Sequence, residues 1–142
     1  MEEILAKAIQ IAVNAHKGQM DRSGKPYIQH PLRLMNNVHT TEEKIVAILH
    51  DVIEDTDITA DNLKEAGIPE ALVTEIQTLT HDPAVEYDSY VQKIAQHKIA
   101  RKVKMADLKD NMDITRLNII TDKDIERLKK YHRNYMYLKN KQ

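Results

Sequence analysis

An apolar run at residues 45–49 leads directly into the charged cluster His50-Asp51-Val52-Ile53-Glu54-Asp55. This stretch constrains the fold most, because a helix of a soluble protein normally carries its charges on the face that meets water. Side chains four residues apart lie on one face of a helix, which pairs His50 with Glu54 and Asp51 with Asp55. Imidazole and carboxylate together suit a divalent metal, and the second carboxylate pair could act as a base on an attacking water. The alternative interpretation is a helix that ends in a solvent-exposed acidic cap.

The other segments of the chain also show the apolar spacing of helices. Thr40 followed by Glu43 predicts a capping box at the start of the central helix, and Pro31 suits the first turn of the helix before it. Apolar residues do not alternate with polar residues between turn signals, so we expect no strand. The sequence predicts an all-α helical bundle of about seven or eight helices, in the segments 4–15, 30–38, 40–56, 59–67, 69–79, 87–96, 99–116 and from 121 onward.

Length, composition and charge narrow the class of protein. A chain of 142 residues fits one domain, so we expect residues 1–142 to form a single domain. The lack of cysteine excludes disulfides, thiolate zinc sites and cysteine nucleophiles. A net charge of −1 and the lack of an 18-residue apolar run predict no nucleic-acid partner and no membrane partner. The acidic start Met1-Glu2-Glu3 is unlike a secretory signal, so we expect a cytoplasmic location.

A further candidate carboxylate, Asp107, lies in an apolar context. Its neighbours in sequence are Val103, Met105, Ala106 and Leu108, so we expect Asp107 at the boundary of the core. A buried carboxylate is costly unless it is paired, hydrogen-bonded or bound to a metal. The alternative interpretation is an amphipathic helix in which a hydrogen bond satisfies the aspartate.

Four longer motifs surround these residues. They are Ala15-His16-Lys17-Gly18-Gln19, Ser23-Gly24-Lys25-Pro26-Tyr27-Ile28-Gln29-His30-Pro31, Leu49-His50-Asp51-Val52-Ile53-Glu54-Asp55-Thr56 and Lys104-Met105-Ala106-Asp107-Leu108-Lys109-Asp110-Asn111. The order H…HD…D is typical of the HD superfamily of metal-dependent phosphohydrolases. Over residues 4–137 the chain resembles the hydrolase domain of RelA/SpoT-type alarmone enzymes, and especially the stand-alone small alarmone hydrolases.

The resemblance implies a fold, an activity and a set of site residues. The fold is a single HD-type helical domain. The activity is the Mn²⁺-dependent hydrolysis of the 3′-pyrophosphate of a guanosine alarmone such as (p)ppGpp, with another divalent metal as the alternative. The implied metal ligands are His30, His50, Asp51 and Asp107, and the implied catalytic pair is Glu54 and Asp55. The residues implied to contact the nucleotide substrate are Arg22, Ser23, Lys25, Asn111 and Tyr131.

One position departs from the family pattern: Asp21 stands where the family often has arginine. Arginine binds phosphate in a bidentate manner, whereas an acid would repel a polyphosphate. Two alternatives therefore stay open: a different phosphorylated nucleotide (an adenine alarmone or a 2′/3′-phosphate nucleotide), and a nucleotide-binding HD module without turnover. His16 and His81 are candidates for supporting roles. The basic residues Lys93, Lys98, Arg101, Lys102 and Lys104 are interpreted as a solvent-exposed face, or as a rim that attracts an anionic substrate.

Overall fold

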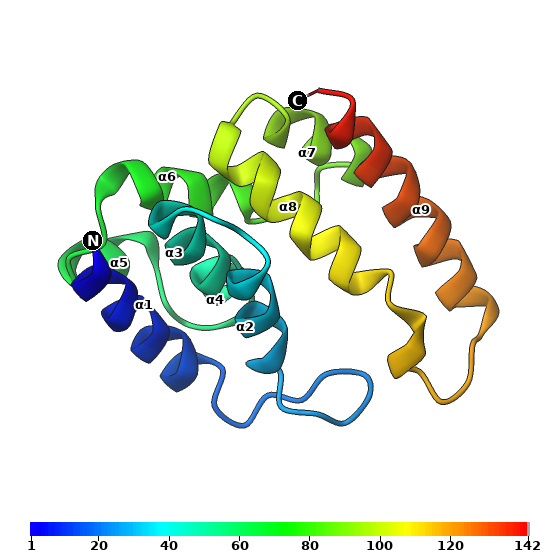
Figure 1. Ribbon diagram of the computed structural model, residues 1–142, viewed down its shortest axis with the longest axis horizontal. Coiled ribbons are helices and arrows are strands. Elements are labelled where there is room, and N and C mark those ends of the chain that lie inside the picture. The colour runs from blue at the N-terminus through cyan, green and yellow to red at the C-terminus, as the bar shows by residue number, and fades with distance from the viewer. Residues whose placement is uncertain (142) are drawn as a thin grey trace.

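Within residues 1–141, which the structure describes, the computed structural model contains nine α-helices, one 3-10 helix and no β-strand (Figure 1). In order they are α1 (Glu2–Ala15), α2 (Gln29–Asn36), α3 (Thr41–Leu49), α4 (Val52–Asp55), α5 (Ala60–Glu65), α6 (Glu70–Leu79), α7 (Tyr87–Ile94), α8 (Lys98–Asn111), η1 (Ile114–Arg116) and α9 (Asp122–Lys139). The all-α prediction is confirmed. None of the helices in this part of the chain is long and apolar enough to cross a membrane.

Side-chain caps define where several helices begin. Thr40 accepts a hydrogen bond from the backbone N–H of Glu43, and the Glu43 carboxylate accepts one from the backbone N–H of Thr40. Equivalent boxes open α5 at Thr59 and α9 at Thr121. Each box satisfies two N–H groups that have no partner within the helix. The capping box predicted for the central helix is therefore present.

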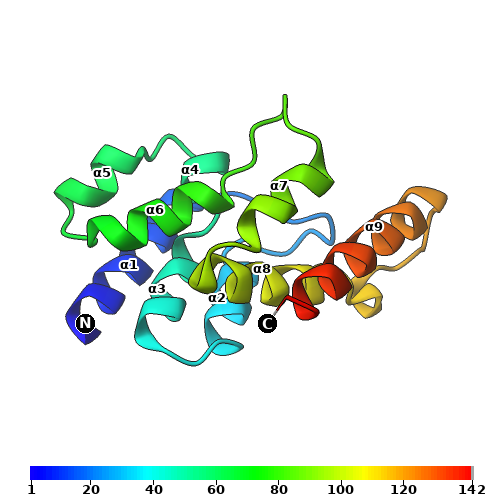
Figure 2. The ribbon, with the colours of Figure 1, turned by 90° about the horizontal axis from the view of Figure 1, so that it is seen from above.

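Helix α3 is the centre of the hydrophobic core. The side chains of its apolar run, residues 45–49, are all fully buried. Helices α1 and α2 pack against α3, and α6 and α8 also contact it (Figure 2). A helix that is enclosed in this way can be apolar on every side, which accounts for the run of five apolar residues before His50.

The central segment, predicted as one helix, is divided between α3 and α4. The backbone N–H of His50 reaches Ala47 O, three residues back, at 3.4 Å, and α4 begins only at Val52. The regular four-residue hydrogen bond returns at Asp55, whose N–H donates to Asp51 O at 2.9 Å. The prediction of an unbroken helix was therefore wrong at His50-Asp51. There the backbone forms a tighter turn, with a hydrogen bond three residues back, beside the polar cavity described below.

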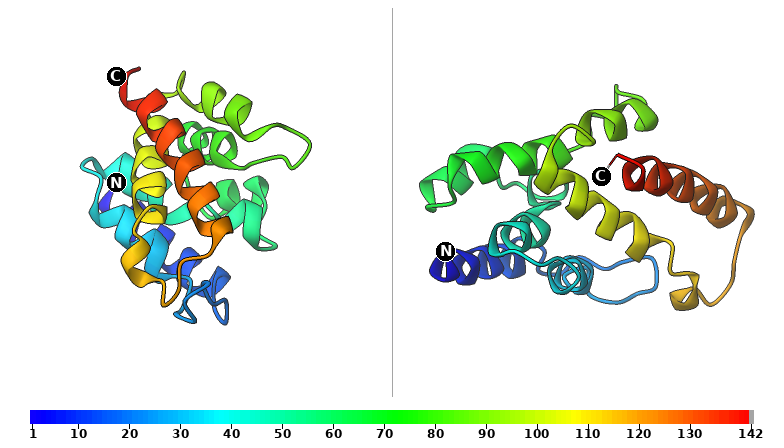
Figure 3. Two further views of the ribbon diagram at one scale, coloured as in Figure 1. Left: turned by 90° about the vertical axis from the view of Figure 1, so that its right-hand side faces the viewer. Right: turned by 45° about the horizontal axis from the view of Figure 1, so that its top comes forward.

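Helix α8 packs against α2, α3 and α6 in the core, and together with η1 and α9 it forms the C-terminal arm, residues 98–139. Helix α9 packs along α8 and also contacts α7 (Figure 3). The segment between α8 and α9, which includes η1, approaches the loop between α1 and α2. The hydroxyl of Ser23 in that loop donates to Arg116 O at 3.3 Å. Residues 93 positions apart in the sequence therefore meet at the edge of one cavity.

Candidate active site

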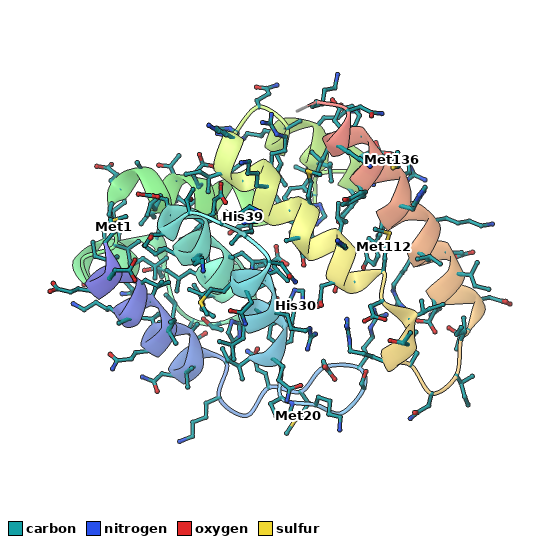
Figure 4. The ribbon with its side chains drawn as sticks, in the orientation of Figure 1. Met1, Met20, His30, His39, Met112 and Met136 are labelled. Atoms are coloured by element: carbon teal, nitrogen blue, oxygen red, sulfur yellow. The ribbon has the colours of Figure 1, made fainter. Side chains whose placement is uncertain are left out.

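A cavity of about 410 Å³ lies between the α1–α2 loop, the α3–α4 break, α7, α8 and α9. Figure 4 shows the labelled His30 on α2, whose side chain contacts α8, and Met20 on the loop that borders the same cavity. The sequence-predicted residues that line it are Arg22, Ser23, His30, His50, Asp51, Glu54, Asp55, Asp107, Asn111 and Tyr131. Lys25 is not among the lining residues.

His30 is oriented by two carboxylates of α8. Its Nδ1–H donates to Asp110 Oδ2 at 2.6 Å, and its Nε2 lies 2.9 Å from Asp107 Oδ1. Burial alone would lower the pKa of His30, but its hydrogen bonds to Asp107 and Asp110 outweigh burial and raise it. A histidine whose outer nitrogen donates to a carboxylate presents the other nitrogen in a fixed direction, as metal-binding histidines do.

His50 presents its Nε2 to the same point. Its Nδ1–H donates to Ala47 O at 2.7 Å, so Nε2 faces the carboxylates. Nε2 lies 2.9 Å from Asp51 Oδ2 and 3.7 Å from Asp107 Oδ1. Although Asp51 is this close, the angle is not that of a hydrogen bond, and Nε2 is a buried atom without a hydrogen-bond partner among the described residues. The short contact is therefore a poor hydrogen bond, because hydrogen bonds weaken steeply when they bend.

The two aspartates have further partners that fix their orientation. The hydroxyl of Tyr27 donates to Asp51 Oδ2. The ammonium of Lys104 lies 2.9 Å from Asp107 Oδ2, and the amide of Asn111 donates to Asp107 Oδ1 at 3.2 Å. Asp107 Oδ1 is thus the oxygen that faces both histidines, while Oδ2 is held by the lysine.

The donor atoms form two groups that suit a divalent cation. The ligand atoms of His30, His50 and Asp107 lie within 4.8 Å of one another, and so do those of Asp51, Glu54 and Asp55. Asp51 connects the groups through its short distance to His50. Burial opposes charge on His50, but Asp51 and Asp107 hold its pKa well above the usual value. A bound cation would replace the proton that these carboxylates attract, and the unpartnered Nε2 fits such an ion.

The acidic pair of α4 lies beside these ligands. Glu54 Oε1 accepts the backbone N–H of His81 at 2.6 Å, which fixes the carboxylate against the loop after α6. Burial and the repulsion of Asp51 and Glu54 raise the pKa of Asp55 to about 6. A carboxylate whose pKa approaches neutrality is a better proton acceptor than an ordinary aspartate.

The loop that carries Asp21 explains the departure from the family pattern. Asp21 Oδ1 accepts the backbone N–H groups of Ser23 and Lys25 at 2.8 and 2.9 Å. The carboxylate of Asp21 is therefore hydrogen-bonded within its own loop. Arg22 next to it lies 3.8 Å from Asp124 of α9.

Three further residues of this site were not predicted from the sequence as site residues. Asp110 binds His30 and also accepts from Arg33 Nε at 2.8 Å, and Tyr27 binds Asp51. Lys104 is only 8% exposed, so of the two interpretations of the basic residues, the solvent-exposed face was wrong for Lys104. The spacing contained a signal, because Lys104 and Asp110 lie three residues before and after Asp107 on one helix.

Comparison with known proteins gives local matches. No protein-family model matches the chain. It is 48% identical over 59 residues, 39% of its length, to a guanosine-3′,5′-bis(diphosphate) 3′-pyrophosphohydrolase of Haemophilus influenzae. It is 41% identical over 68 residues, 44% of its length, to a putative chloroplastic GTP diphosphokinase of Arabidopsis thaliana. The matches span only 9% and 8% of those two proteins.

Nearly all of the chain aligns with a solved structure of a metazoan ortholog of SpoT, described as hydrolysing ppGpp. The TM-score is 0.77, and the alignment covers 97% of this chain and 84% of that chain at 22% identity. The chain has the fold of a SpoT ortholog. The resemblance to RelA/SpoT-type hydrolases that the motifs indicated is thereby confirmed. In this SpoT-like fold, α2, the break between α3 and α4, α4 and α8 supply the ligand atoms described above.

Proposed function

We propose that this protein is a metal-dependent phosphohydrolase that removes the 3′-pyrophosphate of a guanosine alarmone such as (p)ppGpp, with Mn²⁺ as its metal. The observation that carries the proposal is the convergence of His30, His50 and Asp107 beside Asp51, Glu54 and Asp55 in one cavity. The local identity to a ppGpp pyrophosphohydrolase and the SpoT-like fold also support it. We further propose that residues 1–142 act as a single HD-type domain, as the one hydrophobic core favours.

The proposed metal ligands are His30, His50, Asp51 and Asp107. A divalent ion among imidazole and carboxylate ligands supplies Lewis acidity: it acidifies water and neutralises charge that develops on phosphate. Groups that are not themselves ligands fix the orientation of the ligands, since Asp110 orients His30 and the Ala47 carbonyl orients His50. These outer hydrogen bonds keep both Nε2 atoms aimed at one point, which suits Mn²⁺ as well as other ions of the same class.

The proposed reaction is the attack of water on the phosphorus bonded to the ribose 3′-oxygen. Asp55 or Glu54 accepts the proton of the water, and the raised pKa of Asp55 favours Asp55. The new bond joins the water oxygen to phosphorus, and the bond from phosphorus to the 3′-oxygen breaks. Diphosphate leaves, and the 3′-oxygen takes a proton from solvent to become a hydroxyl.

The proposed contacts to the nucleotide come from the α1–α2 loop and the arm. Arg22 and Ser23 border the cavity on one side, and Asn111 and Tyr131 border it on the other. Lys25 lies in the same loop and is proposed as a contact at its outer edge. Because the loop's own N–H groups engage Asp21, a guanosine alarmone remains the proposed substrate. A cytoplasmic location remains a prediction from the sequence.

A substrate panel tests the proposal. Metal-stripped protein with added Mn²⁺ is given ppGpp, pppGpp, ppApp and NADPH, and products are separated by ion-exchange chromatography. We expect turnover of the guanosine compounds and its loss in Asp107→Asn. Turnover of ppApp or NADPH alone would show that the substrate is a nucleotide other than a guanosine alarmone. Tight binding of nucleotide without any product would indicate the non-catalytic module.

A further inference from the structure

Lys104 is a buried ammonium in the wall of the cavity. It lies one turn before Asp107 on α8, is 8% exposed, and its Nζ is 2.9 Å from Asp107 Oδ2. Among the lining residues within 1–141, it is the one lysine. The ammonium forms an ion pair with the Asp107 carboxylate, which places a positive charge in the cavity wall.

The ammonium has more hydrogen-bond donors than the protein uses. A lysine carries three N–H donors; Asp107 Oδ2 accepts one at 2.9 Å, and the hydroxyl of Tyr87 is a second hydrogen-bond partner. The rings of Tyr87 and Tyr90 lie 5.4 and 5.1 Å from Nζ and stabilise the charge by cation–π contact. A ring face does not accept an N–H group in the way an oxygen does, so the third N–H group has no oxygen acceptor among the hydrogen bonds of residues 1–141. The cavity therefore offers a hydrogen-bond donor to an anion.

The other cations of the cavity already have carboxylate partners that the proposed metal does not use. Arg33 and Arg116 bind Asp110, and Arg22 and Arg127 face Asp124. Lys104 differs, because its partner Asp107 also faces His30 and His50. If Asp107 binds a cation through Oδ1, the negative charge of its carboxylate is shared between that cation and Lys104. The positive charge of Lys104 is then only partly neutralised, and it can attract a second anion beside Asp107.

We propose that Lys104 is a catalytic residue whose ammonium donates a hydrogen bond to a non-bridging oxygen of the phosphate under attack. This inference rests on the proposed function, to which it adds a residue. Lys104 transfers no proton and remains an ammonium throughout. It stabilises the negative charge on the phosphate oxygens while the water–phosphorus bond forms and the bond to the 3′-oxygen breaks. Its fixed place beside Asp107 means that no reorganisation is needed during the reaction.

Equilibrium binding tests this role without relying on turnover. We would measure Mn²⁺ binding by calorimetry, and then the binding of inorganic diphosphate to the Mn²⁺-loaded protein, for wild type, Lys104→Met and Lys104→Arg. Lys109→Met is the matched control, because Lys109 is an exposed lysine of the same helix that lines a different cavity. Lys104→Met should weaken diphosphate binding by about tenfold or more, since a charge-assisted hydrogen bond is lost.

The affinity for Mn²⁺ separates this role from a purely structural one. We expect Lys104→Met to bind Mn²⁺ as tightly as wild type or more tightly, because a neighbouring positive charge is removed. Lys104→Arg should recover part of the diphosphate affinity, and Lys109→Met should change neither affinity. Circular dichroism of each variant shows that it is folded, and if Lys104→Met is not, the arginine variant is compared with wild type for the same ratio of affinities.

Three results would overturn the inference. One is diphosphate affinity within twofold of wild type in Lys104→Met, or in Lys104→Arg should only that variant fold. Another is a parallel loss of Mn²⁺ affinity, which would mean that Lys104 acts only by positioning Asp107. The third is the failure of wild type to bind diphosphate at all. The proposed function is judged separately: if wild type leaves every alarmone intact while diphosphate binding depends on Lys104, the alarmone activity fails and the assignment of Lys104 stands.

Discussion

Asp110 organises the site at the scale of single residues. Its carboxylate accepts from His30, from Arg33 and from Arg116. Burial alone would raise the pKa of Asp110, but His30 and Arg33 outweigh burial and hold this pKa far below its usual range. Because Asp110 fixes the ring of His30, the direction of His30 Nε2 depends on it. Partners of this kind commonly change metal affinity or activity by about 10- to 100-fold when they are removed.

Asp110→Asn should therefore lower Mn²⁺ affinity by about tenfold or more, as measured by calorimetry on metal-stripped protein. Asp113→Asn is the control, because Asp113 also binds Arg116 but has no recorded contact with His30 in residues 1–141. We expect its Mn²⁺ affinity to match wild type. Equal losses in the two variants would assign the effect to Arg116 and would refute the role given to His30 orientation.

The sequence predicted which residues belong to the site better than it predicted how their side chains are placed. The motifs around His30, His50-Asp51 and Asp107 named side chains that the structure places in one cavity. The same motifs contain Lys104 and Asp110, but a charged residue on an amphipathic helix gives no sign of whether it faces solvent or a buried carboxylate. The role of Asp21 also could not be predicted from the sequence, because its hydrogen bonds to the N–H groups of Ser23 and Lys25 depend on the path of the loop.

The central helix shows what local sequence determines at the scale of elements. Thr40 and Glu43 form the predicted capping box, and α3 begins there. The end of α3 depended on tertiary context instead: Leu49 is followed by a tightened turn at His50, which no glycine or proline marks. Polar side chains that converge from α2, α4 and α8 favour this break, and such convergence cannot be recognised from one segment.

Removing the cap should destabilise α3 without affecting the site. Thr40→Ala leaves the N–H of Glu43 without its side-chain acceptor and should lower the free energy of unfolding by about 1 kcal/mol. Thr41→Ala is the matched control, because the side-chain hydrogen bond that Thr41 makes within residues 1–141 is an exposed one to Glu2; its effect should stay within about 0.5 kcal/mol. Urea denaturation followed by circular dichroism measures both. Equal stability of the two variants would contradict the importance of the cap.

At the scale of the whole molecule, the cavity is closed by segments that are distant in sequence. Helix α2, the turn between α3 and α4, and helix α8 bring the proposed ligands together, and the Ser23–Arg116 contact joins the loop to the arm. A cation bound to ligands from three separate segments stabilises the folded state alone, since the unfolded chain does not hold them together. The all-α class was predictable from periodicity, but this convergence required the packing of helices.

Metal should therefore raise the thermal stability. At a Mn²⁺ concentration about 100 times the dissociation constant, the gain is about 2.7 kcal/mol, which corresponds to a rise in Tm of roughly 5–10 °C. His50→Ala should lose most of this rise, whereas His132→Ala, at a histidine of α9 outside the cavity lining, should keep it. Differential scanning calorimetry with and without a chelator measures the shift. An undiminished shift in His50→Ala would place the metal elsewhere.

The most direct test of the proposed hydrolysis is the fate of the water oxygen. Mn²⁺-loaded protein is incubated with ppGpp in ¹⁸O-labelled water, and the products are analysed by mass spectrometry. The proposed attack on the phosphorus next to the ribose predicts one labelled oxygen in the released diphosphate and an unlabelled nucleotide with a free 3′-hydroxyl. Label in orthophosphate, label in the nucleotide, or the absence of any product would contradict it.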